Sequence, residues 1–200
     1  MDCLGRRAVY AESSISPLLN TLPRPAPPAQ VRWHPGAQYL RAQLPELLRP
    51  WLFAEGSLTQ RLIALSGNRF RVQVLAQGWQ RPAAAEARLL GLAPTAQALI
   101  REVILFGGER PWVYARSILP ASTLTGDLRR LRKLQNSSLG ALLFTYPDLR
   151  RQPFEVACSQ GLWGRRSRFE LGRRAHYLDK IRQEKLADDQ RAHPDARAVS

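Results

Sequence analysis

The sequence predicts an α+β domain built around an antiparallel sheet. Segments with the two-residue period of strands dominate the middle and the end of the chain, and segments with the period of helices stand before and between them. A short turn joins two of the strand segments as in a hairpin, which favours antiparallel pairing. With 200 residues, 44% of them hydrophobic, the chain is long enough for one well-buried core and too short for two comfortable domains.

We expect a single domain over residues 39–183, with a disordered segment at either end. Residues 22–35, LPRPAPPAQVRWHP, are rich in proline and predict an extended or disordered lead-in, which we place at residues 1–38. Beyond Gln183 the sequence becomes polar and apolar residues nearly vanish, so residues 184–200 are expected to form a disordered tail.

Two helices are predicted ahead of the sheet. Residues 43–53, QLPELLRPWLF, carry leucines and aromatic residues at mixed spacing around Pro50, which indicates a short helix broken at that proline. Ser57 opens the run SLTQRLIAL, in which a serine and a glutamine stand three residues apart as in a capping box. Three leucines of this run fall on one helical face, so we predict a helix from Leu58 to about Leu65.

The next segments predict strands. The run RFRVQVLAQGW, from Arg69, alternates apolar and polar residues, which is typical of a half-buried strand. Residues 98–106 (ALIREVILF) and 111–119 (PWVYARSIL) flank a pair of glycines and predict a β-hairpin. Arg101 stands among apolar residues in the first arm of this hairpin, and we therefore expect its charged side chain to face an interior.

Further along, residues 121–134 and 139–144 are expected to be helical, since leucines recur at helical spacing in the first segment, with arginines on its other face. Residues 151–158, 165–171 and 175–181 are expected to be strands.

Composition narrows the classes of function. No apolar run is long enough for a membrane span or a secretory signal, so we expect a cytoplasmic protein without integral membrane contact. Cys3 and Cys158 are expected to be free thiols, and three scattered histidines predict no metal site. A net charge of +14 attracts nucleic acid, anionic lipid and small carboxylates alike. Because aromatic and basic residues are not interleaved in a pattern for stacking on nucleotides, we expect no nucleic-acid partner.

Residues 160–171, QGLWGRRSRFEL, combine glycines, a tryptophan and three arginines. On these residues alone, we interpret the segment as a tight turn that enters a strand with exposed arginines.

The same segment also carries a family resemblance. Over residues 51–171 the chain resembles bacterial chorismate lyase in five ordered blocks: EGSLTQRL, IREVILFGGERPWVYARSILP, STLTG, SSLGALLF and the highly specific GLWGRRSR. The resemblance implies a six-stranded antiparallel sheet with helices on one face and an enclosed active site beneath two helical flaps. It also implies cleavage of chorismate to 4-hydroxybenzoate and pyruvate for ubiquinone synthesis, without a metal or cofactor, by what we expect to be a monomer.

The resemblance further implies residues that bind the substrate. Arg101 matches a family arginine that binds the ring carboxylate, and Arg116, in ARSILP, matches a second arginine beneath a flap. Leu58 falls where the family often has methionine, and Leu139 falls where a backbone amide faces the ligand. The alternative for either arginine is a surface position on the polar face of a strand, and the apolar neighbours of Arg101 favour this alternative less for Arg101 than for Arg116. The alternative for either leucine is a residue of the core.

The chain departs from the family at the last strand. The family has a glutamate there, in a hydrophobic segment that ends in Leu-Pro, whereas this chain reads GRRAHYLDKIRQEKLADD. With one residue removed from the turn Asp179 matches the glutamate, and with no gap Lys180 does. We take Asp179 as the catalytic acid-base group, because it preserves the carboxyl chemistry on a shorter arm, ahead of a plain surface aspartate.

Two other functions compete with the enzyme. The first is a non-catalytic protein of the same fold that binds a small aromatic carboxylate, because this fold also serves as the effector-binding half of bacterial transcription regulators. Such regulators carry a winged helix-turn-helix in front, and the N-terminal segment here is too rich in proline to supply one. The second is a nucleic-acid binder, which only the net charge favours.

Overall fold

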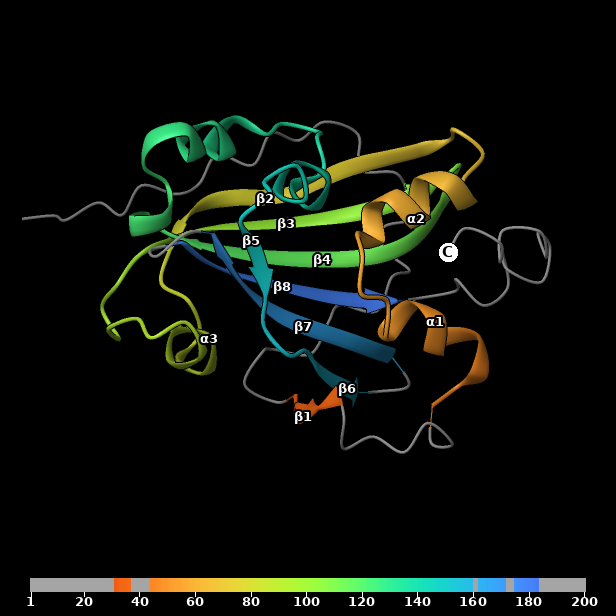
Figure 1. The fold of residues 1–200 in the computed structure, drawn as a ribbon, viewed down its shortest axis with the longest axis horizontal. Helices are drawn as coiled ribbons and strands as arrows, with labels where there is room; N and C mark the ends of the chain where they lie inside the picture. Colours follow the sequence, from red (N-terminus) through yellow and green to blue (C-terminus); the bar gives the residue numbers. More distant parts are fainter. Residues whose placement is uncertain (1–30, 37–43, 160–161, 172–174, 184–200) are drawn as a thin grey trace, which may run out of the picture.

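The computed structural model describes residues 31–36, 44–159, 162–171 and 175–183, and shows an antiparallel sheet with helices packed on it (Figure 1). The strands are β1 (His34–Pro35), β2 (Phe70–Gln80), β3 (Ala98–Gly107), β4 (Arg110–Pro120), β5 (Leu149–Arg151), β6 (Glu155–Ser159), β7 (Leu162–Leu171) and β8 (Ala175–Gln183). The α-helices are α1 (Arg49–Leu52), α2 (Leu58–Leu65), α3 (Ala84–Leu89) and α4 (Leu139–Leu143). The 3-10 helices are η5 (Glu46–Leu48), η6 (Ala121–Thr123) and η7 (Gly126–Lys133).

The sheet follows the order β1-β6-β7-β8-β4-β3-β2, and β5 pairs with β7 beside this path. Strand β8 joins a three-stranded part, β2 to β4, to a four-stranded part that contains β1, β5, β6 and β7. The predicted α+β class and antiparallel pairing are confirmed. The predicted number of six strands is wrong, because the sheet of the described residues has eight. Strands β1 and β5 have two and three residues, too few for a periodic pattern in the sequence.

The hairpin of β3 and β4 is confirmed and lies between β8 and the edge strand β2. Arg101 pairs with Ser117 across this hairpin, and Gln77 of β2 pairs with Arg101 on the other side. Glu102 pairs with Arg116 in the next row. Because successive side chains of a strand point to opposite faces, these two rows belong to opposite faces of the sheet.

Helices cover both faces. On the face of Arg101, leucines of α2, η7 and α4 pack against the apolar residues of β3 and β4. On the other face, Leu89, Leu90 and Leu92 in and after α3 pack against Ile100 and Ile118. The prediction of helices on one face is therefore wrong for α3, since alternation along the hairpin turns a second apolar surface to the side where α3 lies.

The ends of the helices show which local patterns were informative. Helix α2 begins and ends as predicted, and the Ser57 hydroxyl accepts a hydrogen bond from the Gln60 amide at 3.4 Å. The predicted helix broken at Pro50 is instead η5 followed by α1, and the proline lies in the first turn of α1. Proline is tolerated there because that turn needs no amide donor.

The predicted helix over residues 121–134 is divided into η6 and η7. The chain turns between them, where Gly126 has φ of +53°, a conformation that glycine adopts readily. Leu124, Leu131 and Leu134 are buried, so the predicted apolar side is present although the backbone is not one α-helix.

Residues 31–36 correct the prediction of a disordered lead-in at its C-terminal end. His34 and Pro35 of β1 pair with Val156 and Glu155 of β6, so this short stretch belongs to the sheet. Residues 1–30 and 37–38 of the lead-in and the tail at 184–200 lie outside the described residues, and the domain boundaries stay a prediction.

The hairpin makes one sharp prediction about packing. A Cβ atom at Gly107 would overlap the ring of Trp112, which is buried, whereas a Cβ atom at Gly78 of β2 would meet no atom within 4 Å. Gly107→Ala should therefore lower the free energy of unfolding by about 1–3 kcal/mol, the usual cost of overpacking. Gly78→Ala is the matched control and should stay within about 0.5 kcal/mol of the native chain. Equal urea midpoints for the two variants would contradict the packing of Trp112 over Gly107.

Candidate active site

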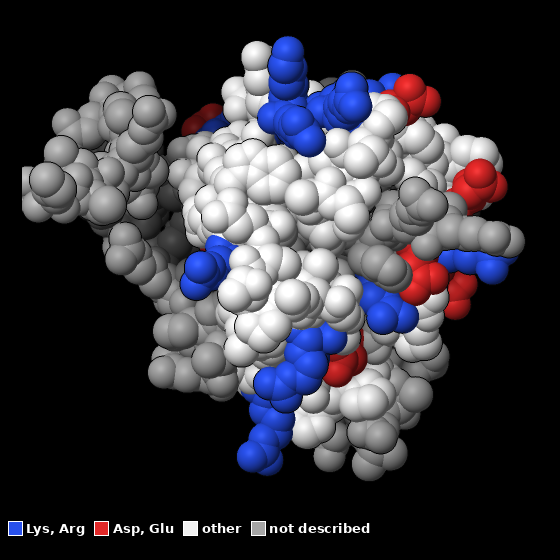
Figure 2. All heavy atoms as spheres, turned by 90° about the vertical axis from the view of Figure 1, so that its left-hand side faces the viewer, with Lys and Arg blue, Asp and Glu red and all other residues white. Residues whose placement is uncertain are grey.

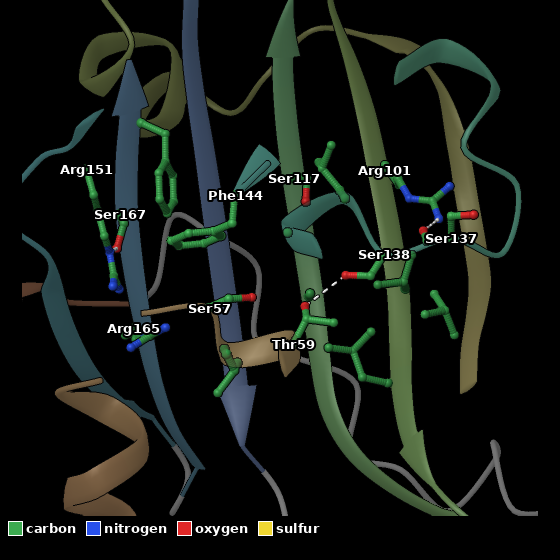
Figure 3. Close-up of a pocket in the computed structure, with 18 residues that line it drawn as sticks. Ser57, Thr59, Arg101, Ser117, Ser137, Ser138, Phe144, Arg151, Arg165 and Ser167 are labelled. Carbon is green, nitrogen blue, oxygen red and sulfur yellow. Dashed lines mark hydrogen bonds between the residues drawn. The ribbon is translucent and has the colours of Figure 1, made fainter. Parts of the chain in front are cut away.

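A pocket lies between the sheet and the first turns of α2 and α4 (Figure 3). About 630 Å³ of space lies between its lining residues, part of it open to solvent. The sheet contributes Val72, Arg101, Val103, Leu105, Ala115, Ser117, Arg165, Ser167 and Phe169, together with Arg151 at the end of β5. The α2 and α4 regions contribute Ser57, Leu58, Thr59, Ser137, Ser138, Leu139, Gly140 and Phe144.

Arg101 places a guanidinium group inside the protein at one side of this pocket. The residue is 2% exposed, which confirms the expectation that it faces an interior. Its Nη1 donates to Oε1 of Gln77 at 2.6 Å, and its Nη2 donates to the carbonyl oxygens of Gln135 at 2.6 Å and Ser137 at 3.0 Å. These three hydrogen bonds to amide and carbonyl oxygens fix the direction of the guanidinium group.

Leu58 and Leu139 are the first residues of α2 and α4, and both are buried and line the pocket. A hydrogen bond of 2.8 Å between the hydroxyl groups of Thr59 and Ser138 ties the two helix starts together. The structure thus brings three of the predicted site residues, Leu58, Arg101 and Leu139, to one pocket. Their contacts with a ligand remain a prediction.

Arg116 is not among the residues that line this pocket, and it forms ion pairs on the other face of the sheet. It belongs to the row of Glu102 on the opposite face, where its Nε donates to Oε1 of Glu86 at 3.1 Å and its Nη1 to Oε1 of Glu102 at 2.5 Å. Burial lowers the pKa of Arg116, but the hydrogen bonds and charges of Glu86 and Glu102 outweigh burial and raise it above its ordinary value. These ion pairs join α3 to the sheet, and the predicted substrate contact of Arg116 stays a prediction.

For β8 the structure describes the backbone, and its register places the two candidate positions in different rows. Asp179 pairs with Ser117 of β4 and with Ser167 of β7, and both serines line the pocket. Lys180 pairs with Arg116 and with Arg166. The side chains of β8 lie outside the described part of the chain.

The sequence analysis missed two arginines of the pocket, Arg151 and Arg165. Arg165 was expected on the surface, yet it is 3% exposed, and its Nη1 donates to the carbonyl oxygens of Trp51 at 3.0 Å and Ala54 at 2.9 Å. Alternation along β7 puts Arg165, Ser167 and Phe169 on one face, and this period was the available signal. The acceptors are the carbonyl oxygens of Trp51 in α1 and of Ala54. No local pattern in the sequence could place this segment beside β7.

Among residues 31–36, 44–159, 162–171 and 175–183, no helix is long and apolar enough to cross a membrane. The same described residues contain no group of three or more His, Cys, Asp or Glu side chains that could hold a metal ion. Figure 2 shows one face of the molecule, where the coloured lysine and arginine side chains stand in separate groups with uncharged residues between them.

The family model and the curated relatives indicate the same family. The family model described as chorismate lyase matches residues 28–178. A protein of Pseudomonas aeruginosa (strain UCBPP-PA14), named "Probable chorismate pyruvate-lyase", is 42% identical over 151 residues, which cover 68% of this chain and 85% of that protein. A protein of Pseudomonas entomophila (strain L48), named "Probable chorismate pyruvate-lyase 2", is 43% identical over 153 residues, covering 71% of this chain and 82% of that protein.

Among solved structures, the effector domain of PhnF from Mycobacterium smegmatis is similar with a TM-score of 0.47 and 14% identity, covering 65% of this chain and 89% of that one. At these values the similarity identifies no common function or ligand.

The ion pair of Arg116 gives a prediction that separates a structural role from a place in the pocket. Arg116→Met removes the cation from Glu86, which is fully buried, and should lower the free energy of unfolding by about 3 kcal/mol. Adding Glu86→Gln to this variant should recover part of the lost stability, because it removes the buried carboxylate charge that Arg116 paired with in the native chain. Urea unfolding of the two variants provides the measurement, and a single variant as stable as the native chain would contradict this role of Arg116.

Proposed function

This chain belongs to the chorismate lyase family, and we propose that the pocket between the sheet, α2 and α4 is where it splits chorismate into 4-hydroxybenzoate and pyruvate. It is a chorismate pyruvate-lyase, which breaks a carbon–oxygen bond by elimination, in the context of ubiquinone biosynthesis. The main support for placing the reaction there is the buried guanidinium group of Arg101, which hydrogen bonds fix at the side of a pocket lined by apolar and hydroxyl side chains.

The reaction makes modest demands on the protein. The C4–H bond of chorismate breaks and its electron pair forms the new double bond between C3 and C4, while the C3–O bond breaks and the enolpyruvyl oxygen leaves with the electron pair of that C3–O bond. Protonation of the departing enolate yields pyruvate, and the ring becomes aromatic. Because aromatisation drives the reaction, it needs no electron sink, and the protein has to bind the dianion in its reactive conformer and assist the movement of one proton.

In the proposed complex Arg101 binds the ring carboxylate. A guanidinium group offers a planar pair of donors that fits a carboxylate, and a contact away from water is stronger and more directional. Leu58 and Leu139 line the same pocket and supply apolar surface for the ring. Helices α2 and α4 with their flanking residues would serve as the flaps that enclose the bound substrate and exclude water.

Asp179 is the proposed acid-base group. Cross-strand partners in an antiparallel sheet share a row, and position 179 stands in the row of Ser117 and Ser167, two residues that line the pocket. Position 180 stands in the row of Arg116, which has its ion pairs on the other face. The register therefore supports the alignment with one residue removed from the turn, and a carboxyl group at position 179 would carry the proton between C4 and the leaving oxygen.

Three further features complete the proposal: a monomer, a cytoplasmic location and the absence of a nucleic-acid partner. Each can be tested separately from the chemistry.

Arg101→Ala tests the carboxylate contact. The affinity for 4-hydroxybenzoate should fall more than tenfold, because loss of a contact to a charged group in a buried site costs roughly 2–5 kcal/mol. Calorimetry with 4-hydroxybenzoate measures this, with the exposed Arg69→Ala as a matched control that should bind like the native chain. Unchanged affinity in Arg101→Ala would sink the proposed role and leave Arg101 a structural residue.

Asp179→Asn tests the acid-base group. This variant should bind 4-hydroxybenzoate within a few fold of the native chain but turn over chorismate roughly 10² times more slowly or worse, the scale for loss of an acid-base group. Asp179→Glu should keep or raise the activity. Lys180→Met is the matched control in the neighbouring row and should leave turnover unchanged. If Asp179→Asn is as fast as the native enzyme, the alignment of the last strand is wrong and another carboxylate, such as Glu184, must be examined.

A further inference from the structure

We propose that the turn formed by residues 134–137 competes with the ligand for Arg101. Two carbonyl oxygens of this turn accept hydrogen bonds from the guanidinium group, and a bound carboxylate has to displace them. This inference rests on the proposed function, because it takes Arg101 as the residue that binds the ring carboxylate. It would make the turn an internal inhibitor, whose stability sets the apparent affinity for chorismate and for 4-hydroxybenzoate alike.

The donors of Arg101 are the first step of the argument. The two pairs of parallel N–H groups on a guanidinium group are Nε with Nη2 and Nη1 with Nη2, so a bidentate carboxylate always takes Nη2. Here Nη2 already donates to the carbonyl oxygens of Gln135 at 2.6 Å and Ser137 at 3.0 Å. Figure 3 shows the bond to Ser137 at the side of the pocket. A carboxylate oxygen that approaches Nη2 meets two oxygens with partial charge of its own sign, so the ligand and the turn compete for this nitrogen.

The two carbonyl groups belong to one small unit that can shift at little cost. The amide of Ser137 donates to the carbonyl oxygen of Leu134 at 2.8 Å and closes the turn. Leu134 at its start and Leu139 beyond its end are buried, whereas residues 135–137 are exposed. A shift of these exposed residues breaks few apolar contacts, which is typical of segments that open locally. The hydroxyl bond between Thr59 and Ser138 holds the start of α4 to α2, so the movement can stay within the turn.

The backbone of the turn carries strain that displacement relieves. Gln135 has φ of +42°, in the left-handed region that residues other than glycine disfavour. Its side chain is exposed, so packing does not impose this conformation, whereas the bond from its carbonyl oxygen to Arg101 stabilises it. Once a carboxylate replaces that bond, residue 135 can return to an ordinary conformation. The relief of strain then offsets part of the cost of displacing the turn.

The affinity for a carboxylate follows from these two states of the turn. With the turn engaged, Nη2 is occupied, and with the turn released, Nη2 can bind the ligand. A ligand that binds one of two states has an apparent affinity in proportion to the population of that state. A change that stabilises the engaged turn should therefore weaken binding, and a change that destabilises it should strengthen binding.

Two substitutions of Gln135 give opposite expectations. Gln135→Gly adopts the left-handed conformation without steric cost, which stabilises the engaged turn and should weaken binding of 4-hydroxybenzoate roughly three- to tenfold. Gln135→Val places a β-branched residue at positive φ, which destabilises the engaged turn and should strengthen binding roughly threefold or more. Calorimetry with 4-hydroxybenzoate measures both affinities. The KM for chorismate should rise in the first variant and fall in the second.

Asn136→Gly and Asn136→Val are the matched controls, because Asn136 is the exposed neighbour and its φ is not positive. Both should bind 4-hydroxybenzoate within about twofold of the native chain, the scale of an ordinary surface substitution. A crystal structure of the native chain with 4-hydroxybenzoate gives a second measurement that needs no variant. It should show the ligand carboxylate on Nη2 of Arg101 and at least one of the two carbonyl oxygens beyond hydrogen-bond distance.

Three results overturn the proposal: both carbonyl bonds intact in the complex, affinities that fall in both Gln135 variants, or affinities that change in neither. If the native chain binds no 4-hydroxybenzoate, the proposed role of Arg101 and this inference fail together. If it binds 4-hydroxybenzoate but forms no products from chorismate, the proposed reaction fails, and the affinities of the variants still decide the role of the turn.

Discussion

The site depends on the hydrogen bonds that hold the Arg101 guanidinium group inside the protein. A buried charge is costly unless polar groups surround it, and here the acceptors come from Gln77 of β2 and from the carbonyl groups of Gln135 and Ser137. One side chain of β3 thereby connects the neighbouring strand to the segment that leads into α4. The same bonds fix a guanidinium group at the side of the pocket, and a guanidinium group is the side chain best suited to bind a carboxylate.

Alternation along the strands decides which residues can join Arg101. It turns Ser117 to the face of Arg101 and Arg116 to the opposite face, where Glu86 and Glu102 bind it.

Arg101, the hairpin and α2 could be predicted because each has a local signal: apolar neighbours, two strand runs around a glycine pair, and a capping serine before leucines. The burial of Arg165 and the place of Arg151 in the pocket could not, because their acceptors in residues 51–55 lie some hundred residues away in the chain. The two short strands escaped for a similar reason, since pairing partners fix them rather than their own composition.

On both sides of the pocket, carbonyl and hydroxyl oxygens orient the guanidinium groups that line it. At the β3 side these oxygens hold Arg101, and at the β7 side they hold Arg151 and Arg165. Serine and threonine hydroxyls stand between, at positions 59, 117 and 138. Such an arrangement suits a compact dianion whose reaction is driven by aromatisation, because orientation of the substrate is then the larger part of the catalytic task. It also gives a local reason for some of the excess of arginine in a chain with a net charge of +14.

The most direct test of this account is incubation of the purified chain with chorismate, with 4-hydroxybenzoate and pyruvate measured over time and no metal or cofactor added. The account predicts that both products appear in equal amounts and that their rate of formation scales with enzyme concentration. Binding of 4-hydroxybenzoate without any release of pyruvate from chorismate would contradict it, and would identify a protein that binds a small aromatic carboxylate and does not catalyse the elimination.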